Sequence, residues 1–115
     1  MNRQTWTYLV SLKALPFLFE RHPEAGGFRL NLGTEGGTDI ESLVPDVVAA
    51  EAFAAVYPSN NGKLAKDLKK LARACPAVPA KYVFFHAPGF PLGRQSALEL
   101  VDGSIEVWCV DVWRQ

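Results

Sequence analysis

The spacing of apolar residues near the amino terminus predicts a helix. Apolar side chains between Trp6 and Phe19 recur at intervals closer to a helical period than to the two-residue period of a strand. Pro16 lies inside this segment, and because an interior proline removes a hydrogen bond and clashes with the preceding turn, we expect a kink or a restart there. Residues 5–10 (TWTYLV) are also compatible with a short strand. The proline and glycines of residues 22–27 predict where this element ends.

Three strands are predicted in the next part of the chain. Residues 28–32 alternate apolar and polar side chains, as a strand with one buried face does. The glycine-rich loop 33–37 favours a hairpin turn, because it has neither the GxGxxG spacing nor the lysine of a phosphate-binding loop. Residues 38–43 form the second predicted strand and residues 47–56 the third. The alternative for the third segment is a helix capped by Asp46, because alanine favours helices.

The second half of the chain predicts one amphipathic helix and two further strands. Ser59 is a candidate N-cap for the helix, whose leucines and basic residues recur on opposite sides at helical spacing. Residues 81–86 (KYVFFH) predict a short strand inside the sheet, and residues 105–113 predict a final, mostly buried strand. Between them, residues 87–95 form a proline- and glycine-rich loop, and residues 96–101 fit a short strand or a single helical turn.

Composition predicts one intracellular domain. The 115 residues, 49% of them apolar, are enough for a single domain spanning 1–115 with its own core. Twelve basic and twelve acidic residues cancel, so no overall field draws the chain to nucleic acid or to a membrane surface. The two cysteines lie far apart, and no segment approaches the roughly 20 apolar residues of a membrane helix. We therefore expect a cytoplasmic protein without membrane association.

Glu51 is the residue that most needs an explanation. It is the single acid in the apolar stretch 47–56. A buried carboxylate without a partner costs several kcal/mol, so we expect Glu51 to meet a cation, a proton or water. A base of the first helix could supply that partner, and solvent could do so if the segment is helical.

The order helix, three strands, helix, strand resembles the common core of the PD-(D/E)xK nuclease superfamily. The resemblance covers residues 5–86, with the last strand as an addition, and rests on this order and on two acids, Asp39 and Glu51. It implies the restriction-endonuclease-like fold, an α/β (α+β) architecture with a mixed central sheet flanked by helices. It also implies that both acids bind Mg²⁺, which prefers oxygen ligands and keeps several of its waters.

The family places a lysine two residues after the second acid, and this chain departs from that pattern. The position falls on Phe53, which can neither polarise water nor stabilise the charge of a phosphoryl transition state. Some members supply the lysine from the following helix, and Lys63 and Lys66 stand at the start of that helix here. Glu20 resembles the additional acid that many members carry on the first helix, as a third metal ligand.

A set of basic residues could hold a nucleic-acid backbone without reading its bases. These residues are Lys63, Lys66, Lys70, Arg73 and Arg94. The stripe on the helix also fits an ordinary solvated face. Asp39, which lies between the glycine-rich loop and Ile40, also fits a role in holding turn amides.

Two functions from different classes follow from these patterns. The first is a small magnesium-dependent nuclease-like domain that hydrolyses DNA or RNA, either weakly active or degenerate. The second is a non-catalytic protein-interaction module, such as an immunity or antitoxin-like protein. Phe53 in the lysine position favours the second function, as do Trp108 and Trp113, because exposed aromatic residues commonly anchor interfaces. A homodimer joined through the last strand is compatible with either.

Overall fold

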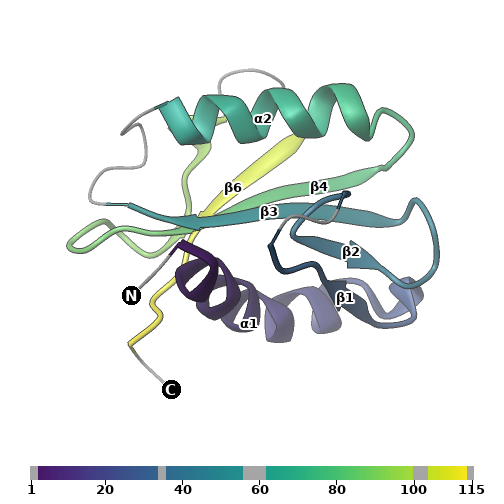
Figure 1. Cartoon of the computed structure of the whole chain (residues 1–115), viewed down its shortest axis with the longest axis horizontal. Coiled ribbons are helices and arrows are strands. Elements are labelled where there is room, and N and C mark those ends of the chain that lie inside the picture. The colour runs from purple at the N-terminus through teal and green to yellow at the C-terminus, as the bar shows by residue number, and fades with distance from the viewer. Residues whose placement is uncertain (1–2, 34–35, 56–61, 100–103, 114–115) are drawn as a thin grey trace.

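The structure is a computed structural model, and it describes residues 3–33, 36–55, 62–99 and 104–113. These residues contain two α-helices and one six-stranded sheet (Figure 1). In chain order the elements are α1 (Arg3–Arg21), β1 (Phe28–Leu30), β2 (Ile40–Ser42), β3 (Val48–Ala54), α2 (Lys63–Ala74), β4 (Ala80–His86), β5 (Gly93–Arg94) and β6 (Ile105–Cys109), with single 3-10 turns at Pro23–Ala25 and Ser96–Leu98.

The sheet is mixed, and its strand order is β1-β2-β3-β4-β6-β5. The first three strands form an antiparallel meander. β3, β4 and β6 run parallel to one another, and β5 closes the far edge antiparallel to β6. This arrangement confirms the expected α+β class with a mixed sheet flanked by helices. The carboxyl ends of the three parallel strands meet at one end of the sheet, where α/β proteins commonly bind ligands.

Each helix covers one face of the sheet (Figure 1). Small side chains on β3 (Val48, Ala50 and Ala52) face α1, whose buried Val10, Ala14 and Leu18 follow one another at four-residue spacing. Phe53 faces the leucines of α2 on the other side. The core therefore consists of two apolar layers separated by the sheet, and successive residues of β3 alternate between them.

The structure decides the alternatives that the sequence left open. Residues 48–54 form a strand, so the helix alternative capped by Asp46 is wrong; Val56 and the candidate N-cap Ser59 lie outside the described residues. α1 includes residues 5–10, so the alternative of a strand there is wrong. The helix continues through Pro16, because Pro16 and Leu12, whose carbonyl loses its partner, both lie on the exposed side.

Two differences concern the carboxyl-terminal half. The loop predicted at 87–95 contains the short edge strand β5, and the single helical turn predicted as one option after it is observed at Ser96–Leu98. The last strand ends at Cys109 instead of continuing to Trp113. Beyond it, the N–H of Trp113 bonds to the Asp111 carboxylate, which turns the chain away from the sheet. In the described part of the chain, no helix is long and apolar enough to cross a membrane.

The connection between β2 and β3 is fixed by one buried hydroxyl. Ser42 Oγ accepts hydrogen bonds from the N–H groups of Val47 and Val48, at 3.3 and 2.9 Å, and it lies 2.7 Å from the carbonyl oxygen of Val44, to which it donates. Asp46 has a positive φ of 63°, a conformation that aspartate tolerates better than most residues. This turn sets the register of β3 against β2, and therefore the position of Glu51.

Candidate functional site

Asp39 and Glu51 meet where the backbone ladder between β2 and β3 ends. The pairing includes Ile40 opposite Ala50. One residue further, the N–H of Asp39 donates to Oε2 of Glu51 at 2.8 Å, and the N–H of Ala52 donates to Oδ2 of Asp39 at 2.9 Å. The two carboxylates thus take the place of backbone acceptors. Asp39 therefore holds a backbone amide, as one sequence interpretation expected, but it is an amide of β3.

The environment of this pair favours a neighbouring positive charge. Glu51 is only 2% exposed, and its Oε1 forms an ion pair with the ammonium of Lys70 from α2. Burial and the charge of Glu51 raise the pKa of Asp39 to about 7. Burial lowers the pKa of Lys70, but the carboxylate of Glu51 outweighs this and raises it overall. Two acids therefore share one lysine, and protonation of Asp39 relieves their repulsion.

Asp67, on α2, is a third acid near this pair, and the sequence analysis did not identify it. It is 2% exposed, and its Oδ1 accepts a hydrogen bond from Lys63 at 2.8 Å. Its Oδ2 has no hydrogen-bond partner among the described residues, and burial raises its pKa. A signal was present in the sequence, because Asp67 interrupts the apolar stripe formed by Leu64, Leu68 and Leu71.

The basic stripe of α2 divides into two groups. Lys63 and Lys70 turn toward acids and form ion pairs with Asp67 and Glu51. Lys66 and Arg73 are exposed on the helix surface. The lysine that contacts the Asp39–Glu51 pair is therefore Lys70, which the sequence assigned to backbone binding, while Lys63 and Lys66 were the candidates for the catalytic lysine.

Two other candidates lie on the opposite side of the sheet. Glu20 is exposed on α1, whereas the carboxylate of Glu51 pairs with Lys70 of α2. The two helices lie on opposite faces of the sheet (Figure 1). Arg94 is opposite Trp108 in the β5–β6 ladder, so its side chain shares the α1 face with that tryptophan. The structure thus does not bring Glu20 to the two acids or Arg94 to the cations of α2. Among the described residues, no group of three or more His, Cys, Asp or Glu side chains could hold a metal ion.

A groove of about 440 Å³ runs between β2 and the second half of α2. Its charged lining consists of Arg29, Glu41, Asp46 and Lys70. Arg29 and Glu41 form an ion pair with each other at 3.2 Å, so Lys70 is the cation that joins this groove to Glu51. The buried acid is therefore held by a base, but that base stands at the wall of an open groove.

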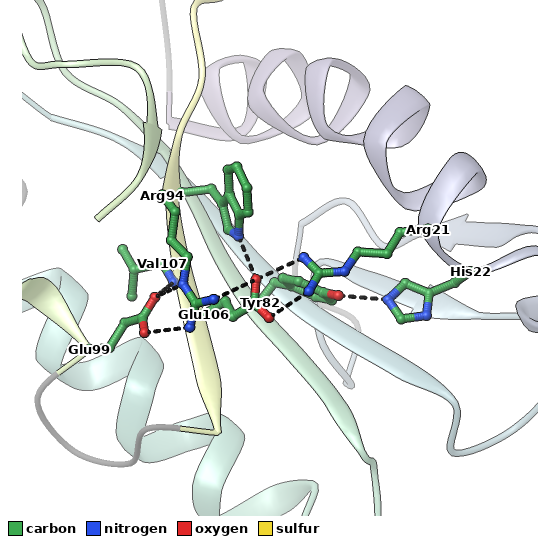
Figure 2. Close-up of polar contacts among 8 residues, drawn as sticks. Arg21, His22, Tyr82, Arg94, Glu99, Glu106 and Val107 are labelled. Atoms are coloured by element: carbon green, nitrogen blue, oxygen red, sulfur yellow. Dashed lines mark hydrogen bonds and ion pairs between the residues drawn. The ribbon is translucent and has the colours of Figure 1, made fainter. Parts of the chain in front are cut away.

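A second polar cluster, on the α1 face, has a structural role (Figure 2). Arg21 forms two hydrogen bonds with Glu106, at 2.9 and 3.0 Å, and Arg94 forms two with Glu99, both at 2.9 Å. The N–H of Val107 also donates to Glu99. These paired charges join α1, β6 and the segment after β5. Arg94 is thus engaged within the fold, which is a different role from the nucleic-acid contact expected of it.

The raised pKa of Asp39 predicts a pH-dependent stability. A pKa raised from 3.8 to about 7 means that the folded state holds this proton more tightly than the unfolded chain does. The stabilisation is complete below the ordinary pKa and is lost as the pH rises through about 7. We expect the free energy of unfolding to fall by about 2 kcal/mol between about pH 5 and about pH 8, less than the full shift allows because Asp39 is only partly buried. Urea denaturation at a series of pH values in this range measures that fall in the free energy of unfolding.

Asp39→Asn provides the control for that measurement. The amide oxygen can still accept the hydrogen bond from Ala52, and the amide group has no charge to repel Glu51. The variant should therefore lose most of the decline in stability between the two pH values. An equal decline in both proteins would show that Asp39 does not carry the proton.

Comparisons of this chain with protein-family models, curated proteins and solved structures found no match.

Proposed function

We propose that this chain is a small metal-dependent nuclease-like domain that hydrolyses phosphodiester bonds, with a restriction-endonuclease-like fold. The observation that supports this most is the meeting of Asp39 and Glu51 at the end of the β2–β3 ladder, with the ammonium of Lys70 beside them. The order α1, β1–β3, α2, β4 supports the same fold. In this proposal Lys70 replaces the lysine that is missing at Phe53.

The donor set fits a small divalent cation. Asp39 and Glu51 offer carboxylate oxygens from adjacent strands, and Mg²⁺ completes its octahedral shell with waters when proteins supply only one or two carboxylates. The two acids and Lys70 sum to one negative charge when all are ionised, which favours a further cation. When bound, the metal would lower the pKa of a water and offset charge on the phosphate.

Each residue of the site has a distinct role in this proposal. Asp39 and Glu51 hold the cation, and Asp39 loses its proton to do so. Lys70 lines the groove, where its ammonium can pair with a phosphate oxygen. Lys66 and Arg73, exposed on the same helix, would attract the backbone of DNA or RNA. We do not include Arg94 in this surface, because it lies on the other face of the sheet.

Calorimetric titration with Mg²⁺ and Mn²⁺, followed by a cleavage assay on DNA and RNA, tests the proposal. The wild type should bind metal, and Asp39→Asn should bind it at least about tenfold more weakly. Affinity should rise with pH through about 7, because the proton on Asp39 must leave before the cation binds. Glu20→Gln is the matched control, an acid on the far side of the sheet that should change neither binding nor cleavage. Absence of metal-dependent cleavage would overturn the proposal.

A non-catalytic protein-interaction module is the second candidate. It is favoured by Phe53 in the lysine position and by the ion pair that already neutralises Glu51. The ion pair would then stabilise the fold rather than serve a reaction. A chain that neither binds divalent metal nor cleaves nucleic acid, but is captured by a specific protein, would fit this candidate.

A further inference from the structure

The outer side of α1 carries a row of apolar side chains that the described part of the fold does not fully cover. Tyr8, Leu12 and Phe19 are 39%, 37% and 53% exposed, and Leu15, between the last two, is half-buried. The four residues follow one another at intervals of four, three and four, so they form one stripe along the helix. We call this row the outer stripe. The residues that α1 buries against the sheet lie on a different side of the helix.

The outer stripe contains no charged residue. Between Gln4 and Phe19 the helix carries a single charge, that of Lys13. Each helical residue is rotated by about 100° from the one before it, so Lys13 lies about 130° around the helix from the middle of the outer stripe. A helix face that meets only water normally carries charged residues, whereas the centre of a protein interface is depleted of them. The composition of the outer stripe is therefore typical of an interface.

The rest of the fold holds the outer stripe in position. On the opposite side of α1, Val10, Ala14 and Leu18 are fully buried against the sheet. At one end of the stripe, the ring of Phe19 packs edge-on against Phe28 of β1, at 5.2 Å between centroids. Side chains that are ordered before they meet a partner lose little conformational entropy on binding. α1 is also the outer layer on its side of the sheet, so a partner can reach it (Figure 1).

We infer that the outer stripe is the interface of a weak homodimer, in which two copies of α1 pack antiparallel about a two-fold axis. The stripe has the same pattern in both directions, because it runs from an aromatic residue through two leucines to a second aromatic residue, with equal intervals at its two ends. A two-fold axis between Leu12 and Leu15 therefore places each of these leucines opposite the other one in the second copy. It also places Tyr8 of one copy opposite Phe19 of the other.

This symmetry is the reason to assign the outer stripe to a second copy of the chain. A two-fold interface uses the same patch on both subunits, so the patch must be complementary to itself. A partner of different sequence imposes no such condition. Intervals of four and three residues are also those by which two helices interdigitate at a small crossing angle. Pairing the stripe with itself brings no like charges together, because its only nearby charge, Lys13, lies away from it.

A membrane surface fits the outer stripe less well. Helices that lie on membranes carry several basic residues on the polar face beside their apolar stripe. Lys13 is the single basic residue between Gln4 and Glu20, and Arg21 forms an ion pair with Glu106. The charges that would attract anionic lipids are therefore few on this side of the protein.

The small size of the outer stripe sets the strength of the dimer. Tyr8, Leu12 and Phe19 together expose about 250 Å² in each copy, on a scale where a whole aromatic side chain covers about 150–250 Å². Each partner in a stable complex of standard size buries about 800 Å². Even with the surrounding polar residues, the contact lies in the range of transient complexes, so we expect a dissociation constant on the order of tens of micromolar.

The homodimer predicted from the sequence used a different surface, the last strand. β6 lies between β4 and β5 in the sheet, so a second copy could pair with it there only by displacing β5. Trp108 packs against Phe17 at 4.6 Å between centroids and donates its indole N–H to Glu106, so it does not anchor an interface. Trp113 is 68% exposed and contacts Trp6, but it is one ring, whereas the outer stripe presents four side chains in a row.

Sedimentation velocity from about 1 to about 500 µM protein tests the inference, because this range brackets the expected dissociation constant. The wild type should pass from monomer to dimer within it. Leu12→Glu should weaken the dimer at least about tenfold, because two carboxylates then meet beside the axis. Leu12 is partly exposed and glutamate favours helices, so this variant should stay folded, which circular dichroism checks. Leu92→Glu is the matched control, the same change at a leucine that is 56% exposed in the loop before β5, and it should dimerise like the wild type.

Two double variants test the antiparallel arrangement. Tyr8→Glu with Phe19→Lys places opposite charges against each other across the axis, whereas Tyr8→Glu with Phe19→Glu places like charges there. The two positions are about 16 Å apart along one helix, so they do not pair within a single chain. At low ionic strength we expect the first double variant to dimerise at least about tenfold more tightly than the second.

A wild type that remains monomeric at the highest concentration would overturn the inference. A dimer that Leu12→Glu leaves unchanged would do the same, because it would use another face, and so would equal affinities of the two double variants. If the wild type binds as a monomer to vesicles of phosphatidylcholine and phosphatidylserine, and Leu12→Glu does not, the outer stripe is a membrane surface instead. None of these measurements involves metal or nucleic acid, so their outcome is independent of the proposed function.

Discussion

Lys70→Ala will lower the free energy of unfolding by about 3 kcal/mol at about pH 8. Glu51 is 2% exposed and cannot turn to water when its partner is removed. The loss comes from the uncompensated buried carboxylate more than from the ion pair itself, since the side chain of Lys70 is 46% exposed and water can solvate its ammonium. At lower pH the loss should shrink, because Asp39 then takes up a proton and no longer repels Glu51.

Urea denaturation of three further proteins separates this cause from simple loss of a lysine. Lys66→Ala removes an exposed lysine from the same helix and should change stability by no more than about 0.5 kcal/mol. In a Glu51→Gln background no buried charge remains, so adding Lys70→Ala there should cost much less stability than Lys70→Ala costs in the wild type. The double variant is therefore compared with Glu51→Gln alone. If Lys70→Ala behaves like Lys66→Ala, Glu51 does not depend on this lysine.

Local patterns in the sequence were sufficient for most of the fold. The alternation in residues 28–32, the leucine spacing of α2 and the apolar run at 81–86 each predict an element that the structure contains. The need of Glu51 for a partner could be predicted as well, because the cost of burying a carboxylate follows from its neighbours in the chain. The identity of that partner could not be predicted, because it depends on how α2 is rotated over the sheet.

The rotation of α2 explains why Lys70, which the sequence interpretation assigned to backbone binding, is the lysine that contacts Glu51. That interpretation placed four basic residues on one outward stripe, yet Lys63 and Lys70 each precede a buried leucine by one position, as Asp67 does. Residues at the border of the apolar stripe lie close to the sheet and can reach its acids. Lys66 is exposed, away from that border. The same reasoning could have identified Asp67, had an acid within an apolar stripe been treated like Glu51.

The contact among the rings of Trp6, His86 and Trp113 was beyond local reasoning for a different reason. Trp6 and Trp113 lie far apart in the sequence, yet their rings contact each other and both contact His86, the last residue of β4. The sequence analysis extended the last strand to Trp113, which would have placed the indole in the sheet. The actual end at Cys109 frees this residue to turn over His86.

Under the proposed nuclease function, Glu51→Gln will reduce metal-dependent cleavage by at least about a hundredfold, since a lost ligand should cost more than the 10- to 100-fold that changes in outer-shell partners cost. The variant should nevertheless remain folded, with a free energy of unfolding no lower than that of the wild type. Glutamine still offers an oxygen to the N–H of Asp39, and Lys70 is exposed enough to be hydrated. Removal of the buried charge also takes away one cause of the raised pKa of Asp39.

Initial cleavage rates with Mn²⁺, together with urea denaturation of the same samples, check both parts of this prediction. The combination of slower cleavage with unchanged stability is informative. Replacing a residue that serves stability alone would lower the free energy of unfolding, whereas a residue that serves the reaction can be replaced without loss of the fold. Glu20→Gln should match the wild type in both measurements. If Glu51→Gln cleaves at a rate within about threefold of the wild type, Glu51 is not part of the catalytic site. An unfolded Glu51→Gln would instead show that the ion pair with Lys70 maintains the fold, which is the result that the protein-interaction candidate predicts.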